Sequence, residues 1–144
     1  MEYFSLNLVQ YDMYEIIPRL YLSNYTDAKS VPWDFFVINC TKDLPMVKSK
    51  HGTRLSVNDD LRKESIDIMR KNIPLMIKYI DEYPGDVLVH CAAGQQRSAA
   101  VIAAYLMNKK GMSMEEAIKY IKSKKPDAFL TGVNFRDALK SMNT

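Results

Sequence analysis

Short apolar runs alternate along the chain with longer stretches in which apolar residues recur every three or four positions. The short runs predict buried β-strands at Arg19–Leu22, Phe35–Asn39 and Val87–Val89, with Arg54–Val57 as a weaker candidate. Strands of this kind, mixed with helices along one chain, are typical of an α/β domain. We therefore expect a central, mostly parallel sheet that is flanked by helices.

The helical stretches differ in how clearly their ends are marked. Pro74 interrupts a run of apolar residues at helical spacing, and it must kink that helix or mark its first turn. Gly111 ends a strongly apolar helix, and Ser113 with Glu116 forms a capping box for the next one. Among the aromatic residues, we expect Trp33 in the core together with Phe35 and Phe36. The helices are predicted around Ile66–Ile80 and at Ala99–Asn108, Met114–Lys124 and Asn134–Met142.

Composition and charge narrow the class of protein. The 144 residues are 47% hydrophobic and 26% charged, which predicts one folded domain over residues 1–144, with residues 1–15 as an N-terminal extension. No apolar run has the length of a membrane helix, and the net charge of +3 allows an anionic substrate without indicating nucleic acid. Two cysteines cannot form a disulfide scaffold and predict a reducing, intracellular setting. Two histidines without clustered Cys/His spacing give no basis for a metal, and we expect no cofactor.

Residues 86–107 carry the strongest chemical signal. They read as a buried strand, a tight loop and a helix that begins at about Ser98. The loop should lie beyond the carboxyl end of the strand, where α/β sheets usually bind ligands. The backbone N–H groups of the loop and the positive end of the helix would both face this point, which suits a phosphate group. Gly94 permits the sharp turn that such a cradle requires.

Two side chains give this loop its expected reactivity. Cys91 stands at its mouth, where a helix N-terminus and a guanidinium favour the thiolate over the thiol. Arg97 offers a planar fork that can hold two phosphate oxygens at once. A thiolate inside a phosphate cradle predicts attack on phosphorus and a cysteinyl-phosphate intermediate. The simpler interpretation, an inert buried thiol beside a surface cation, leaves the fixed offsets of His90, Gly94 and Ser98 unexplained.

The segment His90-Cys91-x-x-Gly94-x-x-Arg97-Ser98, here called the signature loop, resembles that of the cysteine-dependent protein tyrosine phosphatases. Residues 104–107, Ala-Tyr-Leu-Met, resemble the dual-specificity branch of that superfamily, and the chain is similar to its small, atypical, viral-like members. Weaker likenesses cover roughly residues 15–140. The resemblance implies the dual-specificity phosphatase fold and hydrolysis of phosphotyrosine, phosphoserine and phosphothreonine in proteins.

The resemblance also implies a role for individual residues. An aspartic acid on a nearby loop protonates the leaving oxygen in this family and then activates water; it aligns with Asp59, with Asp60 as the alternative. Ser98 would donate a hydrogen bond to the Cys91 sulfur, and His90 would fix the loop. The residues expected to bind the phosphate are Ala92, Ala93, Gly94, Gln95, Gln96 and Arg97.

This chain departs from the family pattern at two places. Gln95 and Gln96 stand where phosphoinositide phosphatases of the superfamily tend to carry lysines, which argues against a polyphosphorylated lipid as substrate. The family tends to place an Asn three residues before the Phe of the last helix. Here Gly132 holds that position and Asn134 is adjacent to Phe135, which leaves open whether Asn134 braces the signature loop.

The leading hypothesis is a phosphoprotein phosphatase whose partners are phosphorylated proteins rather than nucleic acid or membrane. The sequence leaves the oligomeric state open. The alternatives are a phosphatase for a non-protein phosphate, such as a lipid or an RNA end, and a catalytically weak module that binds phosphorylated partners. The expected location is the cytoplasm, which for a viral protein would be the host-cell cytoplasm or the virion. Cys40 is expected to be a buried core thiol, with a regulatory disulfide to Cys91 as the alternative.

Overall fold

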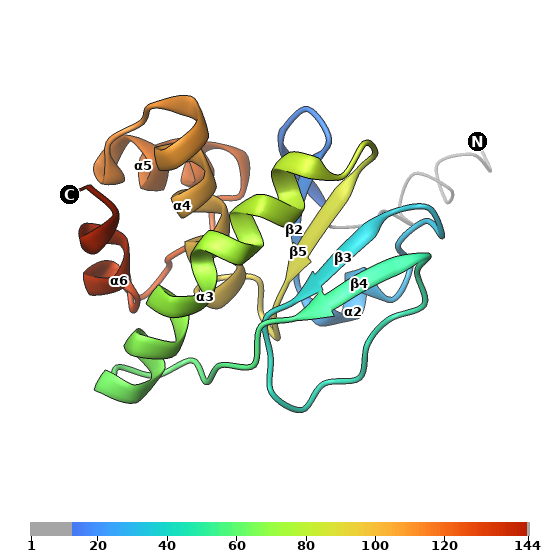
Figure 1. The fold of residues 1–144 in the computed structure, drawn as a ribbon, viewed down its shortest axis with the longest axis horizontal. Coiled ribbons are helices and arrows are strands. Elements are labelled where there is room, and N and C mark those ends of the chain that lie inside the picture. Colours follow the sequence, from blue (N-terminus) through green and yellow to red (C-terminus); the bar gives the residue numbers. More distant parts are fainter. Residues whose placement is uncertain (1–12, 144) are drawn as a thin grey trace, which may run out of the picture.

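Within residues 13–143, which the computed structural model describes, five strands form a central sheet (Figure 1). Its order is β1-β2-β5-β3-β4; β1 runs antiparallel to β2, and the other neighbouring pairs are parallel. The prediction of a central, mostly parallel sheet is confirmed. The strands are β1 (Tyr14–Ile17), β2 (Leu20–Ser23), β3 (Phe36–Asn39), β4 (His51–Arg54) and β5 (Val87–His90).

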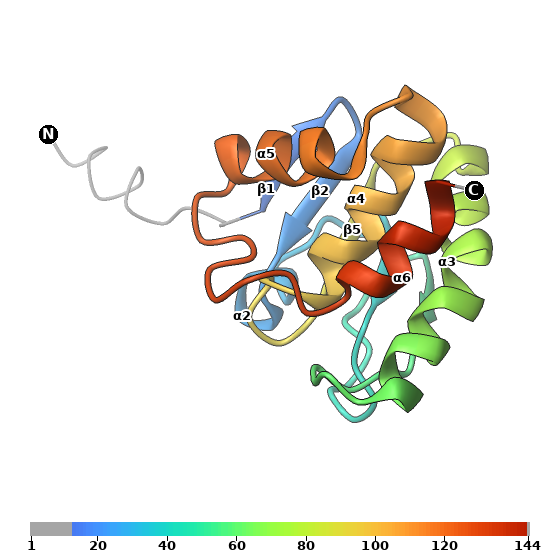
Figure 2. The ribbon, with the colours of Figure 1, turned by 90° about the vertical axis from the view of Figure 1, so that its left-hand side faces the viewer.

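Helices cover both faces of this sheet (Figure 2). On one face lie α3 (Lys63–Glu82), α4 (Arg97–Lys110), α5 (Met114–Lys124), α6 (Arg136–Lys140) and the 3₁₀ turn η1 (Ser141–Asn143); the short helix α2 (Tyr25–Ala28) lies on the other. Successive strand residues point to opposite faces. Ile38 and Val89 therefore belong to the large core under α3–α6, while Val37 and Leu88 belong to the small core with Ala28. No helix within residues 13–143 combines the length and apolar character that crossing a bilayer would need.

The edge strands depart from the sequence prediction. Arg54–Val57 is wrong as a strand, because the strand is His51–Arg54 and residues 55–57 follow it as a loop. β4 needs no apolar run, since it is held by backbone pairing with β3 at the edge of the sheet. β1 is not among the predicted strands, yet Tyr14 and Glu15, which the extension 1–15 includes, pair with β2. Residues 1–12 of that extension lie outside the described residues.

The helix predictions hold best where capping residues define the ends. α5 has the predicted bounds, with the Glu116 N–H donating to Ser113 Oγ at 3.1 Å and the Ser113 N–H donating to the Glu116 carboxylate at 2.8 Å. Gly111 follows α4 with a φ of 69°, the left-handed conformation common at helix ends. α4 begins at Arg97, slightly earlier than predicted. Pro74 lies inside α3 and not in its first turn.

Two further expectations need correction. The prediction that Trp33 lies in the core is wrong, because the residue is 65% exposed. Phe35 and Phe36 are buried as predicted, and Phe35 with Val31 occupies the small core beside β3. The last predicted helix is shorter than expected, since α6 begins only at Arg136 and continues into the η1 turn.

Candidate active site

The signature loop joins the end of β5 to the start of α4. It lies at the carboxyl edge of three adjacent parallel strands, where Ser23 of β2, His90 of β5 and Asn39 of β3 are aligned. This is the edge at which α/β sheets usually bind ligands. α4 begins at Arg97, so the unpaired N–H groups of its first turn border the same loop.

Gly94 allows the loop to press against the connection between β2 and α2. Its φ is +70°, and a Cβ at this position would lie 2.7 Å from both the carbonyl carbon and the oxygen of Ser23. Beside it, the Tyr25 N–H donates a hydrogen bond to the Ala92 carbonyl oxygen at 3.0 Å. One side of the signature loop is therefore fixed against backbone atoms, which cannot move aside as a flexible side chain would.

The side chains of Cys91 and Ser98 lie together in the signature loop. The Cys91 sulfur lies 3.1 Å from the Ser98 hydroxyl oxygen, and both side chains are buried. Ser98 belongs to the first turn of α4, so the helix backbone holds its hydroxyl against the sulfur. A hydroxyl that donates a hydrogen bond in this position stabilises negative charge on the sulfur atom.

Arg97 connects the loop to the segment that follows β4. Its Nη1 donates to the carbonyl oxygen of Val57 at 3.1 Å. Its Nε is buried and has no hydrogen-bond partner within residues 13–143. Leaving such a buried donor unpaired costs about 1–3 kcal/mol. The unpaired N–H is therefore free to donate a hydrogen bond to a ligand at this point.

The two glutamines of the loop turn their side chains toward residues 125–135, here called the 125–135 segment. Gln96 is buried, and its Nε2 donates to the Gly132 carbonyl oxygen at 2.8 Å. Gln95 donates from Nε2 to Asp127 Oδ2 at 3.3 Å, and its backbone carbonyl oxygen accepts the Phe129 N–H at 2.9 Å. Both amides are thus used within the protein, which leaves the backbone N–H groups and Arg97 as the available donors for a phosphate.

The adjacent aspartates have different partners. The Asp59 carboxylate accepts a hydrogen bond from Asn134 Nδ2 at 2.9 Å. Asp60 instead accepts the backbone N–H of Arg62 at 3.0 Å, just before α3 begins. Hydrogen bonds from the Ser65 side chain and then from the Arg62 backbone hold the pKa of Asp60 below its usual value. Asp60 therefore braces the start of α3, while Asp59 is tied to the 125–135 segment.

Asn134 joins the two loops that the sequence analysis considered separately. Its backbone N–H donates to Gln96 Oε1 at 3.0 Å, and its side chain donates to Asp59. The backbone of Asn134, rather than its side chain, contacts the signature loop. Its side chain holds Asp59 instead. Asn134 therefore braces the signature loop through its backbone N–H and not through its side chain.

His90 is buried behind the loop. Its Nδ1 lies 3.2 Å from the Cys91 carbonyl oxygen, which is the geometry of an Nδ1–H donor. Burial lowers the pKa of His90, so the ring is neutral at pH 7. The His90 carbonyl oxygen accepts the N–H of Cys40 at 2.8 Å. Both cysteines are free and buried, and burial raises the pKa of the Cys40 thiol well above its usual value.

Sequence reasoning missed Tyr25 and Asp127 as neighbours of the loop. Tyr25 lies more than 60 residues before Ala92 in the chain, and Asp127 more than 30 after Gln95. Asp127 also accepts a hydrogen bond from the buried Lys125. A proline before Asp127 indicates a turn, but no local pattern shows which part of the fold that turn meets.

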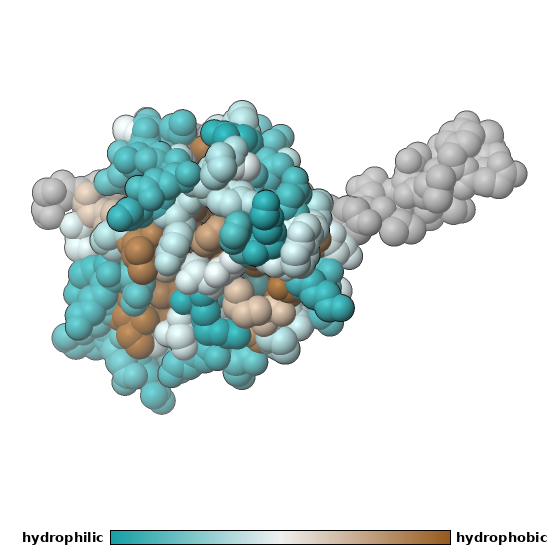
Figure 3. Space-filling model, turned by 45° about the vertical axis from the view of Figure 1, so that its right-hand side comes forward, coloured by the Kyte–Doolittle hydropathy of each residue, from teal (hydrophilic) through white to brown (hydrophobic). Residues whose placement is uncertain are grey.

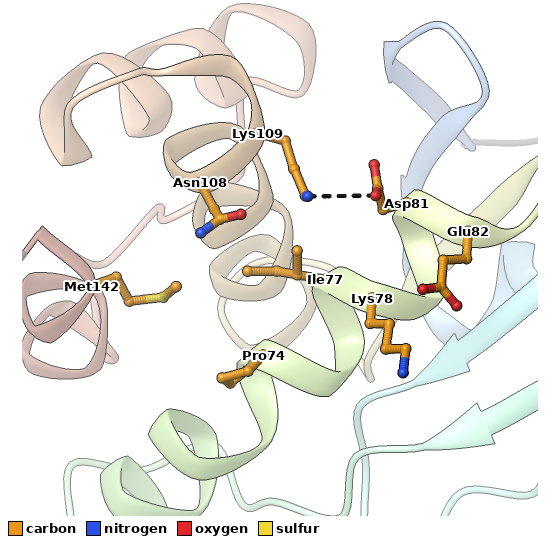
Figure 4. Close-up of a pocket in the computed structure, with 8 residues that line it drawn as sticks. All are labelled: Pro74, Ile77, Lys78, Asp81, Glu82, Asn108, Lys109 and Met142. Atoms are coloured by element: carbon orange, nitrogen blue, oxygen red, sulfur yellow. Dashed lines mark ion pairs between the residues drawn. The ribbon is translucent and has the colours of Figure 1, made fainter.

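A cavity of about 270 Å³ between α3 and α4 is unrelated to this site (Figure 4). An ion pair between Lys109 and Asp81, 3.4 Å apart, lies at its wall. None of the residues that line it belongs to the signature loop, and none is a cysteine or serine. Within residues 13–143, no three His, Cys, Asp or Glu side chains are grouped as metal ligands would be.

Comparisons with known proteins point to one family. Residues 20–144 match the sequence model of the family described as dual specificity phosphatase, catalytic domain. Dual specificity protein phosphatase 16 of Homo sapiens is 32% identical to this chain over 77% of it and 18% of the relative. Dual specificity protein phosphatase 6 of Homo sapiens is 34% identical over 77% of this chain and 31% of the relative. The chain thus spans less than a third of the length of these curated relatives.

A solved structure supports the same relationship at the level of the fold. The crystal structure of DUSP15 is similar to this chain with a TM-score of 0.79 and 25% sequence identity. The likeness covers 92% of this chain and 87% of that structure.

Proposed function

Because the chain belongs to the dual specificity phosphatase catalytic-domain family, we propose that it hydrolyses phosphotyrosine, phosphoserine and phosphothreonine monoesters in proteins. The observation that carries the proposal is the meeting of Cys91, Ser98 and the unpaired Arg97 Nε at the start of α4. A buried nucleophile, a hydroxyl donor and a guanidinium in one loop are suited to phosphate chemistry.

In the first step, the Cys91 thiolate attacks phosphorus, so that a sulfur–phosphorus bond forms while the bond from phosphorus to the substrate oxygen breaks. Asp59, protonated at this stage, donates its proton to that leaving oxygen. Arg97 and the loop N–H groups hold the non-bridging oxygens as their charge rearranges. The products of this step are the dephosphorylated protein and the cysteinyl phosphate.

In the second step, water attacks the phosphorus of the cysteinyl phosphate. The Asp59 carboxylate takes a proton from this water, and the sulfur–phosphorus bond breaks to return the Cys91 thiolate and inorganic phosphate. Ser98 assists because its hydroxyl, 3.1 Å from the sulfur, stabilises the departing thiolate. The cycle needs no cofactor, since water is the only co-reactant.

The assignment of the acid to Asp59 rests on the partners of the two aspartates. Asp60 is engaged by the start of α3, where its carboxylate accepts the N–H of Arg62. Asp59 is held by Asn134, whose backbone also contacts Gln96 of the signature loop. Asp59 is therefore tied, through one residue, to the loop that carries the nucleophile.

The substrates proposed are phosphorylated proteins in the cytoplasm. The two free, buried thiols support a reducing compartment, because cysteines of secreted proteins are commonly oxidised to disulfides. The neutral side chains of Gln95 and Gln96 support a single phosphate group as the ligand of the loop, since they add no positive charge for further phosphates.

The test is hydrolysis of p-nitrophenyl phosphate and of matched phosphotyrosine, phosphoserine and phosphothreonine peptides, with and without Cys91→Ser. We expect turnover of all three peptides that is lost in Cys91→Ser. Turnover that survives Cys91→Ser would refute the mechanism, and activity on phosphotyrosine alone would refute the dual specificity. For the acid, Asp59→Asn should flatten the basic limb of the pH–rate profile, whereas Asp60→Asn should not.

A further inference from the structure

A second hollow lies directly beside the signature loop. It has a volume of about 270 Å³ and is called the side pocket here. α2 provides one wall, and the segment between β3 and β4 provides the other. Tyr25 connects this wall to the signature loop, because its N–H donates to the Ala92 carbonyl oxygen and its ring centre lies 5.9 Å from that of His90. The residues that line the side pocket are Tyr25, Lys29, Met46, Val47 and Lys48.

The side pocket combines apolar surface with two positive charges. Met46 is 40% exposed and Val47 is partly buried, so they present an apolar surface between the two lysines in the lining. The Lys29 ammonium lies 4.7 Å from the centre of the Tyr25 ring, so it is held against the residue that connects α2 to the signature loop. Neither Lys29 nor Lys48 forms an ion pair with a carboxylate of residues 13–143.

Most lysines of residues 13–143 lack a carboxylate partner, and Lys29 and Lys48 differ from them in lining one and the same hollow. On the face drawn in Figure 3, hydrophobic surface is divided into small patches between hydrophilic ones, and no broad apolar face is present. The lysines with an ion pair to a carboxylate within residues 13–143 are Lys63, Lys109 and Lys125. Two unneutralised ammonium groups around a small hollow therefore favour a ligand that brings its own negative charge.

We propose that the side pocket binds an acidic side chain, Asp or Glu, of the phosphoprotein substrate, close in sequence to the phosphorylated residue. This inference rests on the function proposed above and adds a substrate preference to it. An extended peptide advances about 3.3 Å per residue, so a site next to Ala92 is within reach of the first few neighbours of the phosphorylated residue. The hollow has room for one side chain, whose methylene groups would contact Met46 and Val47 while its carboxylate meets the lysines.

The experiment compares two phosphotyrosine peptides that differ only in the residues flanking the phosphotyrosine, which are Glu in one peptide and Gln in the other. For the unchanged protein at low ionic strength, we expect kcat/KM to be about three to ten times higher for the Glu peptide, the range given by one or two exposed ion pairs. The ratio should fall to about one in the double variant Lys29→Ala/Lys48→Ala and stay high in Lys29→Arg/Lys48→Arg. Lys78→Ala, an exposed lysine at the cavity between α3 and α4, is the matched control and should keep the ratio.

A Glu-to-Gln ratio of one in the unchanged protein, or a high ratio that survives the double alanine variant, would overturn the proposal. Binding of the same peptides to Cys91→Ser separates this failure from failure of the proposed function. If no phosphopeptide is turned over but Cys91→Ser still prefers the Glu peptide through Lys29 and Lys48, the side pocket stands and the enzymatic proposal fails. If turnover occurs without any such preference, the reverse holds.

Discussion

Gly94 provides the sharpest test of how the signature loop is built. The change Gly94→Ala adds one methyl group at a φ of +70°, where it would meet Ser23 carbonyl atoms at 2.7 Å and the Asn24 nitrogen at 2.9 Å. The left-handed backbone alone costs a residue with a Cβ about 1–2 kcal/mol. Contact with immovable backbone adds about 1–3 kcal/mol, as in other overpacked sites. We therefore expect a loss of about 2–5 kcal/mol out of a typical total of about 5–15 kcal/mol.

Gly111 offers a matched control for this prediction. Its φ of +69° is nearly identical, but a Cβ there has no atom within 4 Å. Gly111→Ala should therefore cost only the backbone part, about 1–2 kcal/mol, and leave the geometry of the loop intact. The difference between the two variants then measures the collision with the β2–α2 connection.

The assay has two readouts, the free energy of unfolding in urea and kcat/KM for p-nitrophenyl phosphate. Gly94→Ala should be destabilised more than Gly111→Ala, and its kcat/KM should fall at least about tenfold, since a displacement of only 1 Å at a reacting group can cost about a hundredfold. If Gly94→Ala is as stable and as active as Gly111→Ala, the loop is not pressed against Ser23 and the reasoning is wrong.

Three further predictions concern single contacts of the site. Asn134→Ala removes the hydrogen bond that holds Asp59, so kcat for phosphopeptides should fall about two- to tenfold. The leaving group of p-nitrophenyl phosphate needs little protonation, so an equal loss with this substrate would contradict a role of Asn134 in positioning the acid. The pKa of Asp60 is lowered, so its contribution to stability is present above about pH 4 and is lost as the pH falls through its folded-state pKa. The urea midpoint of Asp60→Asn should therefore be lower than that of the unchanged protein at pH 7, and the two midpoints should converge at low pH. Iodoacetamide at pH 7 should modify Cys91 before Cys40, because burial raises the Cys40 pKa, and peptide mass spectrometry that finds Cys40 modified first would contradict this order.

The elements that sequence patterns predicted well are those whose burial is two-sided or whose ends are capped. β3 and β5 are apolar on both faces because helices cover both faces, and the small core with Val37 and the large core with Ile38 fill alternate positions. α5 was predictable at both ends because Ser113 and Glu116 satisfy its first N–H groups locally. In these cases the residues that decide the structure are close together in the sequence.

The parts that could not be predicted depend on distant neighbours. His51 and Gly52 form an edge strand only because β3 lies beside them, and no apolar pattern accompanies that pairing. Trp33 is exposed because other side chains fill the small core, which no local pattern indicates. The same limit applied at the site: the signature loop was visible in the sequence, but the partners of its glutamines in the 125–135 segment were not.

Those partners affect how Asp59, the proposed acid, and Cys91, the proposed nucleophile, keep their relative positions. One side of the signature loop rests on the backbone of the β2–α2 connection, where Gly94 and Ala92 make the contacts. The other side is held by the Gln96 amide, which accepts the Asn134 N–H, and the Asn134 side chain in turn holds Asp59. A displacement of the 125–135 segment would therefore move the acid and the phosphate cradle together. Because the Gln96 side chain makes this connection, the proposed function needs other side chains to recognise charge. We propose Arg97 for the phosphate and the lysines of the side pocket for the neighbouring residues of the substrate.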